Sequence, residues 1–289
     1  MSQILYSSTF YIPVIMEIKH LELTNFNNFK FKVDYYQLQK DPQLLVQKRP
    51  LMIIFPGGYF THLSLREGEP VALAYATYGF DCAIVSYNLV TDPQPIYPDA
   101  ALSGLTTVKY FRDNSEELGI DPNKIVTIGF SAGGHVTSSV NVMAESEKWQ
   151  KEFGFNHDEV APNATILGYP LIDITKIGMK LTSEEMAYLP KDPELLNTAK
   201  GVTKQTPPTF IFQTDDDPVV FVDNSIEYLT ALRKNNVPFE VHLFDKGQHG
   251  YSLGLPDLES EGKAWQVNPH VAHWFNLSIE WLEHLKIAA

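Results

Sequence analysis

The chain has 289 residues, of which 44% are hydrophobic and 20% charged, and these values are typical of a globular protein with a sizeable core. Acidic residues outnumber basic ones by 35 to 22, which gives a formal net charge of −13. Because Lys and Arg form no visible cluster, this balance argues against nucleic acid and anionic membrane surfaces as partners. The length suits a single α/β domain spanning residues 1–289.

The sequence shows no sign of secretion or of membrane insertion. The single cysteine, Cys82, excludes an intrachain disulfide and lies in an apolar run that is typical of a buried strand. No stretch approaches the roughly 20 apolar residues of a membrane span. Residues 1–15 lack a basic region and a small-residue cleavage site. We therefore interpret them as an N-terminal extension of a cytoplasmic protein.

Strands dominate the first third of the chain. Apolar and polar residues alternate in residues 18–23 and 29–35, which predicts two antiparallel strands with one face in solvent. The apolar runs 51–55 and 82–85 predict two buried strands, with a helix over residues 67–78 between them.

Helices and strands alternate in the rest of the chain. Apolar residues recur along one face from residue 101 to residue 111, which predicts a long helix. Four further runs predict strands, at residues 125–128, 164–167, 210–212 and 239–243. Asn268-Pro269 is a typical helix start, so we expect the last helix to begin there.

This order of elements predicts a mostly parallel, doubly wound sheet flanked by helices. Ligands of such sheets bind outside the carboxyl ends of the strands. Gly58, Ser131, Asp217 and His249 each follow a predicted strand. We therefore expect these residues to meet on one rim of the sheet.

Residues 129–133 read Gly-Phe-Ser-Ala-Gly, which matches the pattern G-x-S-x-G. A strand precedes the motif, and apolar residues at helical spacing follow it from Val136 to Met143. In that context the serine lies at the tip of a strained turn, called the nucleophile elbow, and the flanking glycines must be small. Ser131 is therefore the candidate nucleophile, and the N–H of Ala132 is a candidate donor to an oxyanion hole.

A serine hydroxyl becomes a strong nucleophile only when a base within hydrogen-bond reach takes its proton. Among nine histidines, His249 follows the last predicted strand in a glycine-containing loop, so it is the candidate base. His62 lies near the Pro-Gly-Gly turn and is a candidate substrate contact. Asp215, Asp216 and Asp217 follow another strand, and each is a candidate for the acid that orients the histidine.

Several short motifs follow one another in a characteristic order: Phe55-Pro-Gly-Gly-Tyr59, Arg66-Glu67, Ser86-Tyr-Asn-Leu89, Gly129-Phe-Ser-Ala-Gly-Gly-His135, Gly168-Tyr-Pro170, Asp217-Pro-Val-Val220 and Gly247-Gln-His-Gly250. With these motifs, residues 17–285 resemble the α/β-hydrolase esterases and lipases. More narrowly, the chain resembles a bacterial group of carbohydrate-esterase-like enzymes or acetylesterases that are often labelled xylan esterases. The resemblance implies an α/β-hydrolase fold with a Ser-Asp-His catalytic triad.

The resemblance also implies roles for single residues. The acid of the family stands in the pattern D-x-x-V, which selects Asp217 among the adjacent aspartates. By the family pattern, Gly58 and Tyr59 supply oxyanion-hole N–H groups together with Ala132. The loop reads Pro-Gly-Gly-Tyr where the family pattern is His-Gly-Gly-Gly. We therefore expect the Tyr59 side chain to contact the substrate, as we do for His62.

Residues 171–206 show no clean periodicity and stand where the family carries lid or cap insertions. We interpret them as a short, lid-like insertion. A lid of this size leaves a modest pocket, which favours short acyl groups over long lipid chains.

The resemblance implies a serine carboxylesterase that hydrolyses short-chain acyl esters, with acetyl groups on carbohydrates as expected substrates. Two alternatives stay open. An arylformamidase-like amide hydrolase is one, because those enzymes carry an HGGYW-like loop similar to residues 57–59; a non-catalytic α/β-hydrolase-like binding protein is the other. The sequence has no H-E-x-x-H, C-x-x-C or P-loop motif, so we expect neither a metal nor a cofactor. The expected partner is a small-molecule ester, and a homo-oligomer is compatible with the sequence.

Overall fold

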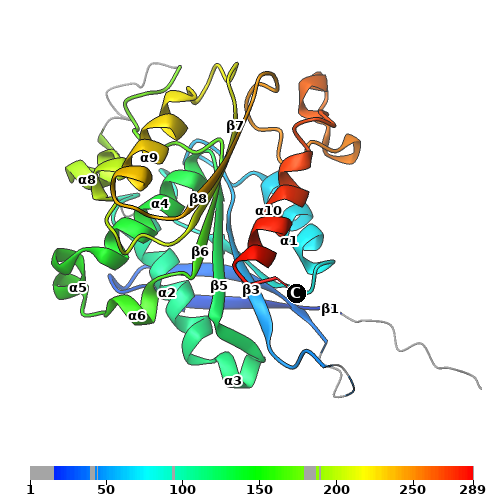
Figure 1. Ribbon diagram of the computed structural model, residues 1–289. Helices are drawn as coiled ribbons and strands as arrows, with labels where there is room; N and C mark the ends of the chain where they lie inside the picture. The colour runs from blue at the N-terminus through cyan, green and yellow to red at the C-terminus, as the bar shows by residue number, and fades with distance from the viewer. Residues whose placement is uncertain are drawn as a thin grey trace, which may run out of the picture.

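A computed structural model describes residues 16–39, 43, 45–92, 95–178, 187–188 and 190–288. The predicted N-terminal extension, residues 1–15, lies outside these residues. An eight-stranded sheet runs through the described part in the order β1-β2-β4-β3-β5-β6-β7-β8 (Figure 1). The strands are β1 (Met16–Thr24), β2 (Lys30–Leu38), β3 (Arg49–Phe55), β4 (Asp81–Ser86), β5 (Ile120–Phe130), β6 (Ala164–Gly168), β7 (Thr209–Thr214) and β8 (Phe239–Phe244).

The first two strands differ from the rest of the sheet in direction and in burial. β1 pairs with β2, and β2 with β4, in antiparallel fashion, whereas the other neighbours are parallel. β2 alternates between buried and more exposed residues, while β6 and β7 are buried along their whole length. Helices cover both faces of the parallel part, which explains the continuous burial there. The predicted mostly parallel, doubly wound sheet is confirmed.

Helices flank the sheet on both faces. Figure 1 shows α1 and α10 on one face and α2, α4 and α9 on the other. The α-helices are α1 (Glu69–Ala76), α2 (Asp99–Asp113), α3 (Ser115–Leu118), α4 (Ala132–Glu145), α5 (Glu147–Phe153), α6 (His157–Val160), α8 (Pro193–Leu196), α9 (Asp223–Lys234) and α10 (His273–His284). Short 3₁₀ helices span Leu65–Glu67, Thr198–Gly201, Pro256–Leu258 and Ala264–Gln266.

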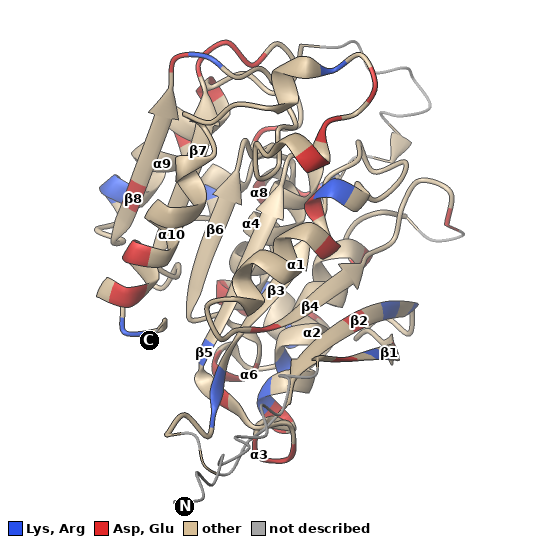
Figure 2. Ribbon diagram, turned by 90° about the vertical axis from the view of Figure 1, so that its right-hand side faces the viewer, with Lys and Arg blue, Asp and Glu red and all other residues tan. Residues whose placement is uncertain are grey.

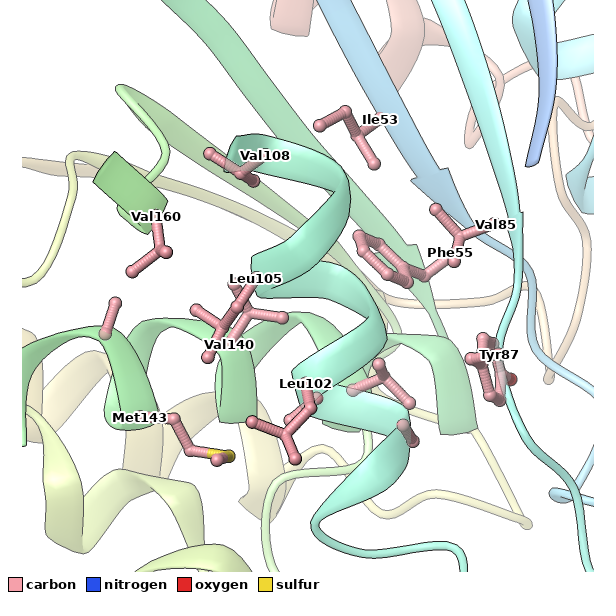
Figure 3. Packing of buried hydrophobic residues seen from close by; sticks show 14 of the residues in the cluster. Ile53, Phe55, Val85, Tyr87, Leu102, Leu105, Val108, Val140, Met143 and Val160 are labelled. Carbon is pink, nitrogen blue, oxygen red and sulfur yellow. The ribbon is translucent and has the colours of Figure 1, made fainter. Parts of the chain in front are cut away.

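Alternate residues of β3 supply the cores on the two faces, as the pleat of a strand requires. Phe55 packs into the cluster formed with α2 and α4, whereas Ile54 packs into the cluster formed with α1 and α10. Figure 3 shows the first cluster, in which Leu105 of α2 lies beside Val140 of α4. A Cβ atom on Gly104 would lie 2.4 Å from Cγ2 of Val140, so the glycine permits this close approach of the helices.

The predicted start of the last helix is wrong. Helix α10 begins at His273, five residues after the predicted cap. The Oδ1 atom of Asn268 instead accepts hydrogen bonds from the N–H groups of His270 and Val271, each at 3.1 Å. Asparagine followed by proline suits a turn as well as a helix start, and here it holds the turn ahead of the helix.

The described part of residues 171–206 contains α8 and the 3₁₀ helix Thr198–Gly201. Isolated bridges pair Asp173 with Asn197 and Ile177 with Val220. Residues 179–186 and 189 lie outside the described residues. The interpretation of this segment as a lid stays a prediction.

Charged residues are dispersed over the described part of the molecule. Figure 2 shows Lys and Arg on several separate elements, interspersed with Asp and Glu. No helix among the described residues is both long enough and apolar enough to cross a membrane.

The register of the parallel strands brings their carboxyl ends to one edge. Phe55 of β3 pairs with Gly129 of β5, and Phe130 pairs with Gly168 of β6. Farther along the sheet, Thr214 of β7 pairs with Phe244 of β8. The loops that follow these strands therefore lie beside one another, where the sequence predicts the site.

Candidate active site

Ser131 lies in the turn between β5 and α4, with φ 52° and ψ −120°. A positive φ is unfavourable for serine, so the surrounding structure must hold this conformation. The Ser131 N–H donates to the carbonyl oxygen of Gly168 at 3.0 Å, and the Leu171 N–H donates to the carbonyl oxygen of Ser131 at 3.0 Å. The N–H of Ser131 is thus bonded to the last residue of β6, and its carbonyl oxygen to the loop that follows β6.

The glycines of the G-x-S-x-G pattern have a steric reason. A Cβ atom on Gly129 would lie 2.1 Å from Oγ1 of Thr137, and one on Gly133 would lie 2.0 Å from the carbonyl oxygen of Phe55. Real Cβ atoms do not approach other atoms so closely, so only glycine lets α4 start directly over the strand ends. The sharp turn that exposes Ser131 depends on this contact.

Three side chains from separate loops form a chain of hydrogen bonds. The Oγ atom of Ser131 lies 2.8 Å from Nε2 of His249, and Nδ1 of His249 lies 2.6 Å from Oδ2 of Asp217. Asp217 follows β7 and His249 follows β8. The Asp217 side chain is fully buried, and that of His249 is 9% exposed. The structure thus brings together the predicted nucleophile, acid and base.

The three adjacent aspartates have different surroundings. Oδ1 of Asp217 accepts the N–H groups of Val219 and Val220, each at 2.9 Å, which leaves Oδ2 for the histidine. Asp216 accepts the N–H groups of residues 247 and 248 and so supports the histidine loop. Asp215 is exposed. Of these three carboxylates, only that of Asp217 contacts the histidine side chain.

The turn after β3 orients two backbone N–H groups. The carbonyl oxygen of Gly57 accepts the N–H of Ser64 at 2.9 Å, and that of Gly58 accepts the N–H of Thr61 at 3.0 Å. In a trans peptide the N–H points opposite to the carbonyl of the same peptide group. The N–H groups of Gly58 and Tyr59 are therefore turned away from these partners.

Some N–H groups of the two turns at Ser131 have no acceptor in the part of the protein that the structure describes. Among the described residues, none accepts a hydrogen bond from the N–H of Gly58, Tyr59 or Ala132. The N–H of Gly57, in contrast, donates to Oε2 of Glu67 at 2.8 Å. Backbone donors without a protein acceptor beside a nucleophile are available to a developing oxyanion.

A pocket of about 290 Å³ contains Ser131 and His249 in its lining, at the small end of the range for ligand sites. Tyr59, which is 48% exposed, and the exposed His62 both line it, so the structure places both predicted substrate contacts at the pocket. None of the described residues of 171–206 lines this pocket. Lys263 and Trp265, from the segment between β8 and α10, do.

Trp265 lines the pocket but was not among the residues predicted from the sequence. Its indole Nε1 donates to the carbonyl oxygen of His249 at 3.3 Å, so it lies against the base as well as the pocket. The residue stands in no motif, and its segment has no regular periodicity. Its position after the last strand is the one sequence signal that could have marked it as a site residue, because ligands of parallel sheets bind at that edge.

The Tyr59 hydroxyl is a hydrogen-bond donor at neutral pH. Partial burial, followed by the charges of Asp217 and Glu67, raises the pKa of Tyr59 above its ordinary value. The phenol therefore keeps its proton and can donate to a substrate oxygen.

The described residues contain no cluster of three or more His, Cys, Asp or Glu side chains that could hold a metal ion. The arrangement of Ser131, His249 and Asp217 can support attack of the serine on a carbonyl carbon, because the base is in reach of its proton.

A family model described as BD-FAE matches residues 40–232, which is more than half of the chain. The chain belongs to the BD-FAE family. The BD-FAE match includes Asp217 and ends before His249. The base therefore lies outside the matched region, and its placement rests on the geometry of the site.

Two relatives of this BD-FAE protein are named for enzymes of xylan breakdown. The chain is 32% identical to endo-1,4-beta-xylanase B of Butyrivibrio fibrisolvens over 74% of its own length and 34% of that protein. It is 30% identical to an acetylxylan esterase of Xylanibacter ruminicola over 69% of its length and 40% of that protein. The chain thus spans about a third to two fifths of the length of these relatives.

A solved structure matches the BD-FAE protein over nearly its whole length. The carboxylesterase Cest-2923 from Lactobacillus plantarum WCFS1 superposes with a TM-score of 0.89 at 30% identity, covering 95% of this chain and 99% of that one. The predicted α/β-hydrolase fold is therefore confirmed. So is the predicted resemblance to bacterial esterases, because one of these relatives is named an acetylxylan esterase and the solved structure is named a carboxylesterase.

Proposed function

We propose that this chain is a serine carboxylesterase that hydrolyses short-chain acyl esters, with acetylated carbohydrates as its substrate class. The observation that carries the proposal is the chain of hydrogen bonds from Ser131 through His249 to the buried Asp217. Membership of the BD-FAE family and the names of the relatives support ester hydrolysis as the reaction.

The reaction proceeds in two halves. His249 takes the proton of the Ser131 hydroxyl while Oγ attacks the ester carbonyl, and the resulting oxyanion accepts hydrogen bonds from backbone N–H groups. When the tetrahedral intermediate collapses, the alcohol leaves with the proton from His249. A water molecule then repeats the sequence on the acyl-enzyme and releases the carboxylic acid. Asp217 stabilises the imidazolium in each half.

The N–H groups of Gly58, Tyr59 and Ala132 are the proposed donors of the oxyanion hole. They lack protein acceptors among the described residues and come from the two turns that meet at the nucleophile. Removing one such donor in other acyl-transfer enzymes costs roughly 10²–10³ in kcat. The hole therefore supplies a substantial part of the expected acceleration.

The size and lining of the pocket support the proposed substrates. A volume of about 290 Å³ suits a short acyl group. The rings of Tyr59 and Trp265 line the pocket and offer apolar faces beside polar atoms, which is a suitable surface for the sugar ring of an acetylated carbohydrate. The acetylxylan esterase among the relatives is consistent with this choice.

The residues Gly57-Gly58-Tyr59 keep an arylformamidase-like amide hydrolase as the alternative. The two reactions use the same machinery and differ in the leaving group. The test is a panel of acetyl, butyryl and octanoyl esters together with an N-formylated aniline, each assayed with wild type and with Ser131→Ala. We expect the acetyl ester to give the highest kcat/KM, and Ser131→Ala to be inactive on all of them.

Other outcomes of this panel would exclude the proposal in different ways. A preference for the formamide would assign amide hydrolysis. Failure of the wild type to cleave any ester or amide, with retained binding of an acetylated oligosaccharide, would assign the non-catalytic binding protein.

A further inference from the structure

Glu67 is a buried acid that the proposed chemistry does not use. Its residue is 3% exposed, yet it belongs to the lining of the pocket that contains Ser131. No ion pair involves Glu67 among the described residues. Burying a carboxylate without a cation is costly unless hydrogen bonds replace its hydration.

Each oxygen of Glu67 accepts one hydrogen bond. Oε2 accepts the backbone N–H of Gly57 at 2.8 Å, and Oε1 accepts the hydroxyl of Tyr169 at 2.6 Å. Both carboxyl oxygens of Glu67 are thus occupied as acceptors, and the NH₂ group of an amide in this place would face one of these two donors.

The first bond reaches the oxyanion loop. Gly57 immediately precedes Gly58 and Tyr59, whose N–H groups are the proposed oxyanion donors. A Cβ atom on Gly57 would lie 2.8 Å from Oε2 of Glu67 and 3.0 Å from Cβ of Ser131. The carboxylate, the loop and the nucleophile are therefore packed against one another. A displacement of Glu67 moves the donors relative to the serine.

The second bond reaches the base. The ring of Tyr169 meets the ring of His249 edge to face, with 5.1 Å between centroids and 69° between planes. Its hydroxyl oxygen also accepts the N–H of Ser252 at 3.0 Å, in the loop that follows the histidine. Glu67 thus orients a tyrosine that packs on the histidine and holds its loop. Burial and the charge of Glu67 raise the pKa of Tyr169 well above its ordinary value, so the hydroxyl remains a donor.

Arg66, which precedes Glu67, also links the 3₁₀ helix Leu65–Glu67 to the loop that follows His249. The Arg66 guanidinium donates to the carbonyl oxygens of Gly250 at 2.7 Å and Leu258 at 2.5 Å. The hydroxyl of Ser252 donates back to the carbonyl oxygen of Arg66 at 2.5 Å. The 3₁₀ helix that carries Arg66 and Glu67 is therefore bonded both to the oxyanion loop, through Gly57, and to the loop that follows His249, through Gly250 and Ser252.

We propose that Glu67 is a positioning residue that couples the oxyanion loop, through Gly57, to the loop of the base, through Tyr169. The inference rests on the proposed function and adds a residue whose two carboxyl oxygens are bonded to Gly57 and Tyr169 and not to Ser131 or His249. Glu67 holds the oxyanion donors and His249 in one mutual geometry. Misplacement of a reacting group by about 1 Å can cost on the order of 10² in rate.

The test begins with Glu67→Gln, which keeps the shape of the side chain but presents an NH₂ group to one of the two donors. We expect kcat on the acetyl ester to fall about 10- to 100-fold with KM changed less than about threefold, because the bound ground state needs the oxyanion donors less than the transition state does. Tyr169→Phe keeps the bond from Gly57 to Glu67 and removes the bond from Tyr169, together with the bond that the hydroxyl accepts from the N–H of Ser252, and we expect a smaller loss. The double variant should lose less than the product of the two single losses, because the residues act as one unit.

Glu69→Gln is the matched control. This carboxyl lies two residues farther along, is exposed on α1 and does not line the pocket. We expect wild-type kcat and KM. Thermal unfolding of each variant separates loss of positioning from loss of fold, since we expect Glu67→Gln to stay folded at the assay temperature.

Two further readouts separate this inference from the proposed function. A boronic acid that forms a tetrahedral adduct with the serine should bind Glu67→Gln about 10- to 100-fold more weakly, whereas a product carboxylate should bind equally. The backbone amide signal of Gly57 and the ring signals of His249 in NMR spectra should both shift in Glu67→Gln, even if no ester is a substrate. Wild type inactive on every ester would contradict the proposed function. Unchanged His249 signals in Glu67→Gln, or wild-type kcat in a folded Glu67→Gln, would overturn the coupling.

Discussion

The Nδ1 atom of His249 lies 2.6 Å from Oδ2 of Asp217, and the aspartate side chain has no exposed surface. The carboxylate accepts a hydrogen bond from the N–H at Nδ1. It therefore selects the tautomer in which Nε2 carries no proton and faces the hydroxyl of Ser131. The backbone N–H groups of residues 219 and 220 hold the carboxylate from its other side. This contact prepares the histidine to receive a proton and stabilises the charge that results.

The variant Asp217→Asn tests this relationship. An amide in place of the carboxylate favours the wrong histidine tautomer, so we expect kcat to fall on the order of 10³- to 10⁴-fold with a small change in KM. Steady-state kinetics on an acetyl ester measure the effect. Asp215→Asn is the control, since that side chain is exposed and adjacent in sequence, and it should keep wild-type turnover. A loss of less than tenfold in Asp217→Asn would assign the acid elsewhere.

The side chain of Tyr59 tests the origin of acyl selectivity. It lines the pocket and is 48% exposed, so its removal should lengthen the space beside Ser131. We expect Tyr59→Ala to raise the ratio of kcat/KM for octanoyl over acetyl esters by roughly 10-fold, in line with the value of a few methylenes in an apolar pocket. Tyr59→Phe keeps the ring and removes the donor. If Tyr59→Phe changed the ratio as much as Tyr59→Ala did, a hydrogen bond rather than ring size would set the selectivity.

The order of elements and the residues of the triad could be predicted because each carries a local signal. The G-x-S-x-G pattern needs glycine at position 133, because a Cβ atom there would collide with the carbonyl oxygen of Phe55. Such a steric requirement leaves a motif that can be recognised from the sequence alone. The strand-end positions of Asp217 and His249 follow from the topology of a parallel sheet. The choice among the aspartates depended on the resemblance, because Asp215, Asp216 and Asp217 have the same local signal.

The remaining features depend on contacts between distant segments. Glu67 accepts a hydrogen bond from Tyr169, 102 residues away, and Trp265 reaches the carbonyl oxygen of His249 from the short 3₁₀ helix Ala264–Gln266. No periodicity in the sequence marks such pairs. The start of α10 was mispredicted for a related reason, because the side chain of Asn268 can cap a turn as readily as a helix.

His135, one turn into α4, predicts a dependence of stability on pH. Burial lowers the pKa of His135 from 6.5 to about 3, and its Nδ1 lies 2.5 Å from the hydroxyl of Tyr97. Between pH 6.5 and about 3, His135 is therefore protonated in the unfolded chain and neutral in the folded one. The stability contributed by the neutral ring is fully present above pH 6.5 and is lost as the pH falls toward about 3.

The variant His135→Gln removes this titration. We expect the free energy of unfolding of wild type to fall more steeply with acidification than that of His135→Gln, by up to about 1.4 kcal/mol per pH unit between the two pKa values. Urea titrations at a series of pH values measure both slopes. Above pH 7 the slopes should coincide, which serves as the internal control. Equal slopes at acid pH would mean that the folded state protonates His135 as readily as the unfolded one.

The most direct test of the central claim is the chemical identity of the intermediate. Wild type and Ser131→Ala are mixed with an activated acetyl ester, quenched in acid during turnover, and analysed by peptide mass spectrometry. We predict an acetyl group on Ser131 in wild type, none at the corresponding position of Ser131→Ala, and a loss of roughly 10⁴-fold or more in the kcat of the variant. Turnover by Ser131→Ala at more than a tenth of the wild-type rate would contradict the assignment of Ser131 as the nucleophile.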